Sequence, residues 1–373
     1  MCKKESIKRE SILFGKIFLF TVAVHWIIMF LSYTLLGSFG NVDFFTDFYD
    51  KFTETGDTVH YLRIAENWYT ASGEMANAIV FYPLYPFLMR ILGFAVGDYF
   101  VAGVLISNVC TGVAGYYLYK LTESEIGNSK ALDGLLIWIL YPFASFYIMV
   151  YTEGLSMMLV TMCLYYIKKG KWGIAGVAGM FAALSKSQGI ALLVPAVYEA
   201  VLYIVRNKRF HPRVLFVGLI PAGTFIYLLI NKIVQGDWFA FVSHQEAEPW
   251  YNKAKWISEN ISMQFGMAKD NFELSIIIYG VQIILYFVVI AALFYGLKKK
   301  ISTSLIAFAG AHLFISFLHG WLISGPRYVM GCVTIYIIFA VVPNRFVKAA
   351  VLFACAALTL FYTLGIWQGQ AIM

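Results

Sequence analysis

Four charged residues of this chain stand apart from the rest, because each lies in a polar turn at the edge of an apolar run. Two are cations and two are carboxylic acids. An isolated cation in a tight turn between apolar helices either reaches lipid headgroups or neutralises an anion in a cleft. When the apolar runs are taken as membrane helices, all four residues fall on one side, which favours a polar cavity. They are Asp57 in GDTVHYLRIA, Glu153 in YTEG, Lys186 in SKSQG and Arg327 in SGPRY.

Asp57 is followed by a segment that we expect to form a short amphipathic helix over residues 58–72. Such a helix suits the headgroup zone of a membrane, where Trp and Tyr are favoured. Asp57 then either caps the helix or contributes its carboxylate to the cavity. The two interpretations are compatible, because a helix N-terminus favours an ionised carboxylate. The aromatic and apolar face comprises Tyr61, Leu62, Ala65, Trp68, Tyr69 and Ser72, and the opposite face His60, Arg63, Glu66 and Asn67.

Two further segments carry polar and aromatic residues that could reach the same cavity. Residues 81–94 contain two prolines before a short apolar stretch, which predicts a re-entrant or interfacial helix instead of a full span. Residues 235–256 are rich in Trp and polar residues. In this second segment, Asp237, His244 and Gln245 either line the cavity or belong to a surface loop with aromatic anchors.

The composition places these segments in a membrane protein. The chain has 373 residues, of which 60% are hydrophobic and 13% are charged, whereas soluble domains carry about 25% charged residues. The apolar runs are long enough for helices and lack the alternation of an outer-membrane barrel. The five cysteines form no CxxC motif, which indicates small core residues and not metal ligands or disulfides. We therefore expect an all-α polytopic protein with one integral membrane domain over 1–373.

The distribution of charge predicts which side of the membrane each loop occupies. With the N-terminus in the cytoplasm, most of the 28 Lys and Arg residues lie in inner segments, which are the N-terminal segment and short turns, as the positive-inside rule requires. Basic residues so placed are topology anchors, and we expect no nucleic-acid partner. The outer side receives two large segments, 37–98 and 232–274, so we expect function at the extracytoplasmic face. The eleven expected spans are at about 13–36, 99–119, 131–150, 154–167, 172–185, 189–205, 214–231, 275–297, 301–319, 328–343 and 349–367.

The polar motifs, in this order, resemble those of the PIG-V-like mannosyltransferase family, its bacterial members in particular. That family belongs to the GT-C class of polytopic glycosyltransferases. The chain departs from the family pattern at Gly56, where the pattern has Trp, at Thr58 and His60, and at Lys186, where it has Arg. The motifs that carry the resemblance are Gly56 to Ala65, Phe81 to Pro86, Pro142 and Phe146 with Tyr151-Thr152-Glu153, Ser185 to Gly189, Gly236 to Phe241, and Pro326-Arg327-Tyr328.

The resemblance implies a GT-C-like bundle in a bacterial plasma membrane. It would transfer a sugar to a glycolipid or surface glycan, and mannose is the sugar that the resemblance favours. The donor it implies is a polyprenyl-phosphate sugar, which suits a chain without a Walker loop or a D-x-D motif. By the same resemblance Asp57, in the first outer loop, is the general base of an inverting transfer, and Arg327 and Lys186 bind the donor phosphate. No cofactor or metal is indicated, although a divalent cation is compatible. The expected substrate-binding residues are His60, Tyr61, Arg63, Tyr82, Glu153, Gln188, Asp237, His244 and Gln245.

Two other functions are compatible with a helical polytopic chain. A lipid or solute transporter, or a flippase, places polar groups near the bilayer midplane, often in broken helices. Here the apolar runs are nearly free of charge and the polar groups gather at their outer ends. A non-catalytic subunit is the other alternative, because the first-loop motif is altered. Such a subunit could keep the GT-C-like fold without the activity.

Overall fold

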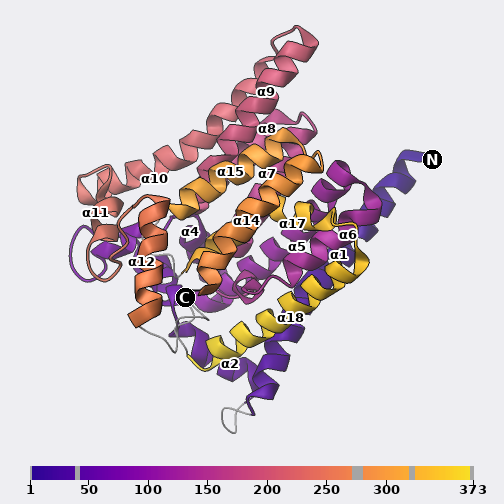
Figure 1. Ribbon diagram of the computed structural model, residues 1–373. Coiled ribbons are helices and arrows are strands. Elements are labelled where there is room, and N and C mark those ends of the chain that lie inside the picture. Colours follow the sequence, from indigo (N-terminus) through magenta and orange to yellow (C-terminus); the bar gives the residue numbers. More distant parts are fainter. Residues whose placement is uncertain (1, 38–42, 271–279, 319–323, 370–373) are drawn as a thin grey trace.

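The computed structural model describes residues 2–37, 43–270, 280–318 and 324–369, and within these ranges every regular element is a helix (Figure 1). The all-α fold expected from the sequence is therefore confirmed for this part of the chain. The α-helices are α1 (Cys2–Leu35), α2 (Phe44–Thr53), α3 (Asp57–Asn67), α4 (Leu84–Val96), α5 (Tyr99–Ile126), α6 (Asn128–Ile139), α7 (Glu153–Lys168), α8 (Trp172–Ser185), α9 (Leu193–Asn207), α10 (Leu219–Gln235), α11 (Ala240–Glu246), α12 (Ile257–Asp270), α14 (Val281–Lys298), α15 (Thr303–Phe317), α16 (Gly325–Met330), α17 (Val333–Ala340) and α18 (Arg345–Trp367). Short 3₁₀ helices are η1 (Ala76–Val80), η2 (Ala144–Tyr147), η3 (Ser187–Leu192) and η4 (Pro212–Gly218).

Five helical stretches in the described ranges are long and apolar enough to cross a membrane, which makes the chain an integral membrane protein. The first two are single long helices, and the next two begin with a 3₁₀ turn that continues into an α-helix. The last one is α18. The stretches are Glu5–Leu35, Tyr99–Ile126, Ser187–Asn207, Pro212–Gln235 and Arg345–Trp367.

Two of the remaining apolar runs are divided into shorter helices, whereas α7 and α8 match the expected runs 154–167 and 172–185 closely, and the count of eleven spans stays a prediction. The run 131–150 is not one helix, because α6 ends at Ile139. Pro142 follows and disfavours helical backbone in the residue before it. The run 328–343 is likewise divided between α16 and α17. In the first outer loop, α3 ends at Asn67 instead of Ser72, because Trp68 has a positive φ of 65°.

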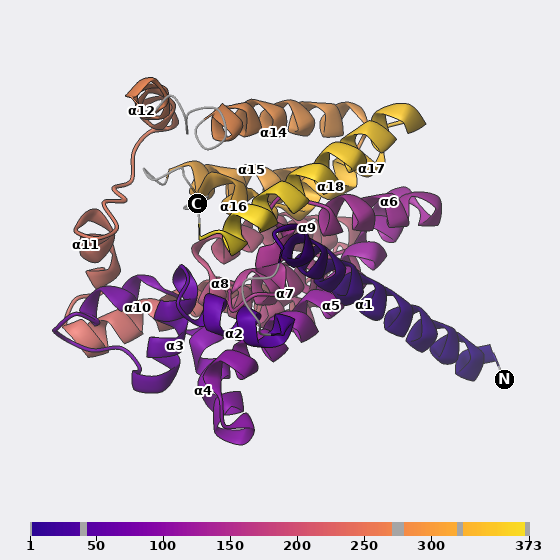
Figure 2. The same cartoon turned by 90° about the horizontal axis from the view of Figure 1, so that it is seen from below.

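The helices pack in two layers (Figure 2). In the first layer α4, α5, α7, α8 and α10 are neighbours in that order, and α1 and α6 also pack on α5. The C-terminal helices lie over this layer: α15 contacts α9, α17 contacts α6, and α14 packs on α15 and α17. Helix α18 packs along α1, so the first and the last helix of the described chain are in contact.

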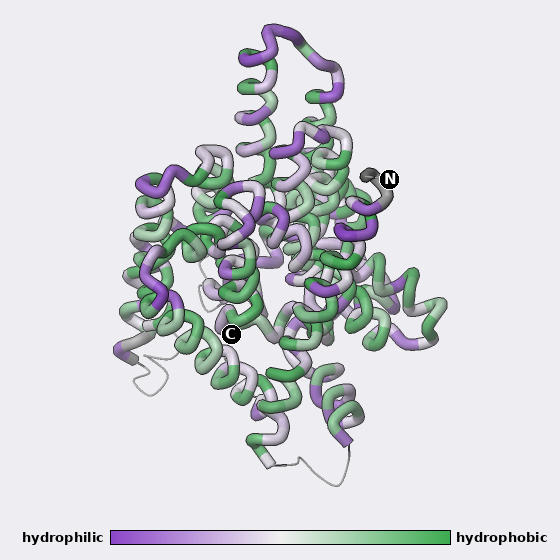
Figure 3. Tube along the Cα trace, turned by 90° about the vertical axis from the view of Figure 1, so that its right-hand side faces the viewer, coloured by the Kyte–Doolittle hydropathy of each residue, from purple (hydrophilic) through white to green (hydrophobic). Residues whose placement is uncertain are grey.

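Polar loops gather at opposite ends of the bundle. The end of α9 and the connection to α10, with Arg206, Lys208, Arg209 and Arg213, form the hydrophilic tip at the top of Figure 3. Helices α2, α11 and α12, from the two large polar segments, lie at the other end of the bundle from this tip (Figure 1). This arrangement is the one that the expected sidedness requires, and the topology itself stays a prediction.

Small residues let the helices of the first layer approach closely, as is common in membranes. A Cβ atom on Gly176 of α8 would lie 2.1 Å from the carbonyl oxygen of Phe216 in η4. A Cβ atom on Gly223 of α10 would lie 2.0 Å from the carbonyl oxygen of Met180 in α8. Backbone atoms cannot move aside as a side chain can. Glycine is therefore required at both positions to keep α8 and α10 in contact.

We expect Gly176→Ala to destabilise the protein, because overpacking of this kind costs about 1–3 kcal/mol. The measurement is the apparent unfolding temperature of the purified protein in detergent. Gly173→Ala is the matched control in the same helix, since a Cβ atom there meets nothing within 4 Å. The control should leave the temperature unchanged or raise it, because alanine restricts the unfolded chain. Equal temperatures for the two variants would contradict the close packing of α8 on η4.

Candidate active site

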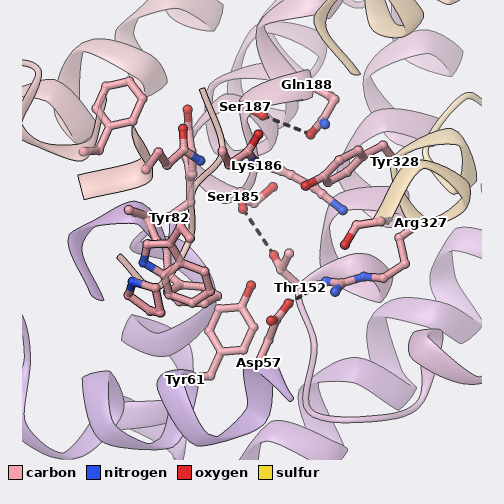
Figure 4. A pocket seen from close by; sticks show the side chains of 18 residues that line it. Asp57, Tyr61, Tyr82, Thr152, Ser185, Lys186, Ser187, Gln188, Arg327 and Tyr328 are labelled. Carbon is pink, nitrogen blue, oxygen red and sulfur yellow. Dashed lines mark hydrogen bonds and ion pairs between the residues drawn. The ribbon is translucent and has the colours of Figure 1, made fainter. Parts of the chain in front are cut away.

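A cavity of about 360 Å³ lies where the two large polar segments meet the ends of α8 and α16 (Figure 4). It is open on one side and has an ionic part and an aromatic part. Six stretches of chain build its wall, so no single motif defines it. The lining residues are Asp57 and Tyr61; Val80, Phe81 and Tyr82; Thr152; Ser185, Lys186, Ser187 and Gln188; Phe241, Gln245, Pro249, Trp250 and Asn252; and Ser324, Arg327 and Tyr328.

The four charged residues singled out in the sequence form one hydrogen-bonded ionic cluster. Nη2 of Arg327 donates to Oδ2 of Asp57 at 2.7 Å and to Oε1 of Glu153 at 2.9 Å. Nε of Arg327 donates to the same Glu153 oxygen at 3.0 Å, and so does Nζ of Lys186, also at 3.0 Å. Side-chain exposure is 24% for Asp57 and 2% for Glu153. Asp57 therefore faces the cavity, whereas Glu153 lies behind the two cations.

Asp57 is held at the start of α3 by the segment that precedes α7. Its backbone N–H donates to the hydroxyl of Tyr151 at 3.2 Å. Gly56 has a φ of 57°, and a Cβ atom on it would lie 2.3 Å from that hydroxyl. The positive φ and the nearby Tyr151 hydroxyl thus both require glycine at position 56, where the family pattern has Trp. Thr58 adds a hydrogen bond to the carbonyl of Val150 at 3.4 Å.

The interpretation of Asp57 as an N-cap is wrong in detail. The N-cap position is Gly56, and Asp57 is the first residue of α3. No side chain caps the N-terminus of this helix with a hydrogen bond. Its carboxylate accepts a hydrogen bond from Arg327 instead. The negative charge still lies in the first turn, where the helix dipole favours it.

Lys186 owes its position to an abrupt end of α8. A Cβ atom on Gly189 would lie 2.2 Å from the carbonyl oxygen of Ala182, so only glycine lets the chain fold back this tightly. Lys186 follows the last residue of α8 in extended conformation, with φ −161° and ψ 149°. Thr152 donates to the carbonyl of Ser185 at 3.3 Å, which joins this turn to the start of α7.

Arg327 is fixed by α16 and by aromatic rings. The hydroxyl of Tyr141 donates to the carbonyl of Pro326 at 2.9 Å, and Nε2 of His312 is 2.8 Å from the carbonyl of Tyr328. The guanidinium carbon lies 4.8 Å from the ring centroid of Tyr151 and 5.2 Å from that of Phe146. Stacking on aromatic faces is a property of Arg that Lys does not share equally.

The charges of the cluster alter the protonation of their neighbours. Burial alone would raise the pKa of Glu153, but Arg327 and Lys186 outweigh it and lower this pKa to about 2. Burial lowers the pKa of Lys186, and Glu153 opposes this shift. Burial also lowers the pKa of His60, although the Asp57 carboxylate acts in the opposite direction. At neutral pH, Glu153 is therefore ionised and His60 is neutral.

Most of the residues that the sequence singled out lie in the cavity wall, from both large polar segments and from the turns after α8 and before α16. This placement shows that they are close together, and it leaves their roles to experiment. The residues in the wall are Asp57, Tyr61, Tyr82, Lys186, Gln188, Gln245 and Arg327.

The other predicted substrate-binding residues lie outside this wall. Glu153 is covered by Arg327 and Lys186. His60 stacks on the Phe81 ring at a centroid distance of 4.9 Å, and Arg63 is exposed one turn further along α3. Asp237 is exposed and accepts from the backbone N–H of Phe239 at 3.1 Å, while Nε2 of His244 is 2.9 Å from Oε1 of Gln235. Direct contact of these five with a ligand in the cavity is therefore not expected.

Several wall residues were not among the predicted site residues. Phe81, Phe241 and Trp250 form part of the aromatic wall, and Tyr328 lies beside Lys186. Three of them, Phe81, Phe241 and Tyr328, belong to the quoted motifs, so the signal was present. Trp250 had no such signal, because its place depends on how the second polar segment folds over the first.

The cluster has donors and an acceptor that remain available to a ligand. Among the described residues, Nη1 of Arg327 and Oδ1 of Asp57 make no hydrogen bond, and Lys186 uses one of its three donors. A basic oxygen thus lies next to cationic donors in a partly buried wall. In the described ranges, no group of three His, Cys, Asp or Glu side chains has the arrangement of a metal site.

Comparison with known proteins shows the fold. No protein-family model matches the chain, and no curated protein matches its sequence. The oligosaccharyltransferase of Archaeoglobus fulgidus in complex with Zn and sulfate superposes with a TM-score of 0.52 at 14% identity, over 93% of this chain and 53% of that chain. Its apo form gives a TM-score of 0.52 at 14% identity, over 95% of this chain and 56% of that chain.

This chain therefore spans about half the length of the solved structures that it matches. It has the fold of a GT-C membrane glycosyltransferase. At such low identity the likeness concerns the fold alone, and the resemblance to the PIG-V-like family rests on the sequence motifs.

Proposed function

We propose that this chain is a membrane glycosyltransferase that moves a sugar from a polyprenyl-phosphate donor to a glycolipid or glycan at the extracytoplasmic face. One observation carries the proposal: in a GT-C fold, Arg327 joins a cavity-facing carboxylate, Asp57, to a buried one, Glu153, beside Lys186. A base next to cationic donors is what displacement of a phosphate by a hydroxyl needs. Mannose is the sugar that the motif resemblance favours.

In the proposed reaction, the hydroxyl oxygen of the acceptor attacks the anomeric carbon of the donor sugar. The bond between that carbon and the phosphate oxygen breaks, so the configuration inverts and the lipid phosphate leaves with the electron pair. Asp57 takes the proton of the hydroxyl through Oδ1, while Oδ2 stays bound to Arg327. The hydrogen bond from Arg327 and the bond from the backbone N–H to Tyr151 orient the base.

The leaving phosphate would be held by the remaining donors of Arg327 and Lys186. Guanidinium groups bind phosphate through two parallel hydrogen bonds, and an ammonium group acts as a point charge. Glu153 does not touch the phosphate in this scheme. Its buried charge holds both cations in place, since both bind its Oε1.

The two alternative functions differ from this proposal in the structure they need. A transporter needs polar groups along a path through the bundle, whereas the cavity described here lies among the polar segments at one end. A non-catalytic subunit has no reason to keep a cavity-facing carboxylate beside two cations. The geometry therefore favours the enzyme, and the variants below distinguish it from both.

We expect Asp57→Asn to abolish transfer, with a loss of about 10²–10⁴-fold if only general-base catalysis is removed. The amide oxygen can still accept from Arg327, so the fold should persist. Purified protein in nanodiscs would be incubated with radiolabelled polyprenyl-phosphate mannose and candidate glycolipids. Glu66→Gln, an exposed carboxylate in the same helix, is the control and should transfer normally. Near-normal transfer by Asp57→Asn would remove Asp57 from the mechanism.

Arg327→Ala should raise the KM for the lipid-linked donor by about ten- to a hundredfold, as expected for the loss of charged hydrogen bonds. The KM for the acceptor should change much less. Initial rates at varied donor and acceptor concentrations separate the two constants. Arg63→Ala removes an exposed arginine outside the cavity and should change neither. An effect on the acceptor KM alone would show that Arg327 does not bind the phosphate.

Glu153→Gln should lower stability markedly, because removing one partner from a buried ionic cluster costs about 3–5 kcal/mol. Two neighbouring cations would then lack their shared anion. The apparent unfolding temperature in detergent and the acceptor KM would be measured together. A stable variant with a changed acceptor KM would instead mean that Glu153 binds the acceptor sugar.

A further inference from the structure

The cavity has a second part that the proposed reaction does not use. Opposite the ionic cluster, the wall is aromatic and comes from Phe81, Tyr82 and Trp250. In Figure 4, Tyr82 lies on one side of the cavity and Arg327 on the other, with Asp57 and Tyr61 below and between them. A molecule that fills the cavity would therefore contact aromatic rings at one end and the base and cations at the other.

The aromatic wall is rigid because each ring is supported from behind. His60 stacks on Phe81 at 4.9 Å with an interplanar angle of 22°, and Trp250 lies 5.1 Å from His60 and 5.4 Å from Phe81. Tyr82 stacks on the buried Tyr227 at 4.1 Å. The neutral state of His60 suits its place among uncharged rings. These faces are fixed before any ligand arrives, which lowers the entropic cost of binding.

Amide and indole groups complement the rings. Gln188 is 3% exposed, and its Nε2 has no acceptor among the described residues, while its Oε1 accepts from Ser187 at 3.2 Å. The indole N–H of Trp250 is also buried without an acceptor in the described ranges. The side chain of Gln245 lines the same wall. Amides both donate and accept hydrogen bonds, as hydroxyl groups do.

We propose that Phe81, Tyr82 and Trp250, with Gln188 and Gln245, form a subsite for the pyranose ring of the acceptor, so that the acceptor is a carbohydrate. The inference rests on the proposed function and names the residues that would hold its acceptor sugar. Aromatic faces carry negative charge density, and the C–H groups of a sugar ring present weakly positive hydrogens to them. Its hydroxyl groups match the amides, and one hydroxyl would lie beside Asp57.

The position of the rings assigns the subsite to the acceptor and not to the donor. The donor sugar is attached to its phosphate, which belongs next to Lys186 and Arg327. The attacking hydroxyl must approach from the side of the anomeric carbon opposite to the phosphate, and the rings are on that side. The cavity volume of about 360 Å³ falls in the range of small-molecule sites, roughly 300–1,000 Å³.

Binding without catalysis tests the subsite independently of the reaction. Full-length protein in nanodiscs of phosphatidylcholine would be mixed with the methyl glycosides of mannose, glucose, galactose and N-acetylglucosamine. Saturation-transfer NMR should detect ring C–H protons of at least one glycoside with the wild type and with Asp57→Asn. Trp250→Leu should weaken that binding by about tenfold, as expected for loss of an aromatic contact, and Trp250→Phe should restore most of it. Trp256→Leu, at an exposed tryptophan outside the wall, should bind like the wild type.

Kinetics then connect the subsite to transfer. Trp250→Leu should raise the acceptor KM by about tenfold and leave the donor KM and kcat within twofold. Equal glycoside binding by Trp250→Leu and the wild type would overturn the subsite, and so would a wild type that binds none of the glycosides. Saturation transfer to a serine-containing tripeptide, with none to the glycosides, would replace the carbohydrate acceptor by a peptide. If the glycosides bind as expected while Asp57→Asn remains active, the subsite stands and the proposed base is wrong.

Discussion

The side chain of Arg327 is the constraint on which the rest of the site depends. Its guanidinium group binds Asp57 at the start of α3 and Glu153 at the start of α7, and it lies itself in α16. Three elements that are distant in the sequence are thus held together by one cation. Lys186 binds the same Glu153 oxygen, so positive and negative charges alternate along the cluster. Without the two cations, the carboxylates would repel each other in a partly dehydrated wall.

The bundle places these charges at the end of the helices and not within them. Close contacts at Gly176 and Gly223 bring α8 and α10 together, and the turn after α8 then presents Lys186 to the cavity. The first polar segment gains its position from Tyr151, whose hydroxyl binds the Asp57 backbone and whose ring lies under Arg327. One tyrosine therefore supports both the carboxylate and the cation, and Gly56 leaves the space that its hydroxyl fills.

The sequence predicted which residues form this cluster but not which of them are hydrogen-bonded to one another. The composition identified the helical fold and the membrane environment. The four charged residues could be identified because charge is rare in an apolar chain, and the loops indicate the side of the membrane on which each charged residue lies. Which carboxylate faces the cavity could not be predicted, since Asp57 and Glu153 differ only in burial. His60 and His244 lie outside the cavity wall for a related reason, and their roles stay predictions: the rotation of the short helices α3 and α11 depends on packing, which no local pattern encodes. The same applies to Trp250, which comes into the wall only through the fold of the second polar segment.

The proposed chemistry gives the shared cation a particular electrostatic role. As Asp57 accepts a proton, the negative charge that faces Nη2 of Arg327 disappears. At the same stage the departing phosphate gains negative charge within reach of Nη1 of the same guanidinium. Arg327 thus stabilises the base before the proton transfer and the leaving phosphate after it, without motion of the protein. This is possible because the positive charge of a guanidinium is delocalised and can interact with both groups. Glu153 keeps its charge throughout, since the two cations stabilise its ionised form, and it therefore holds Arg327 in place during the transfer.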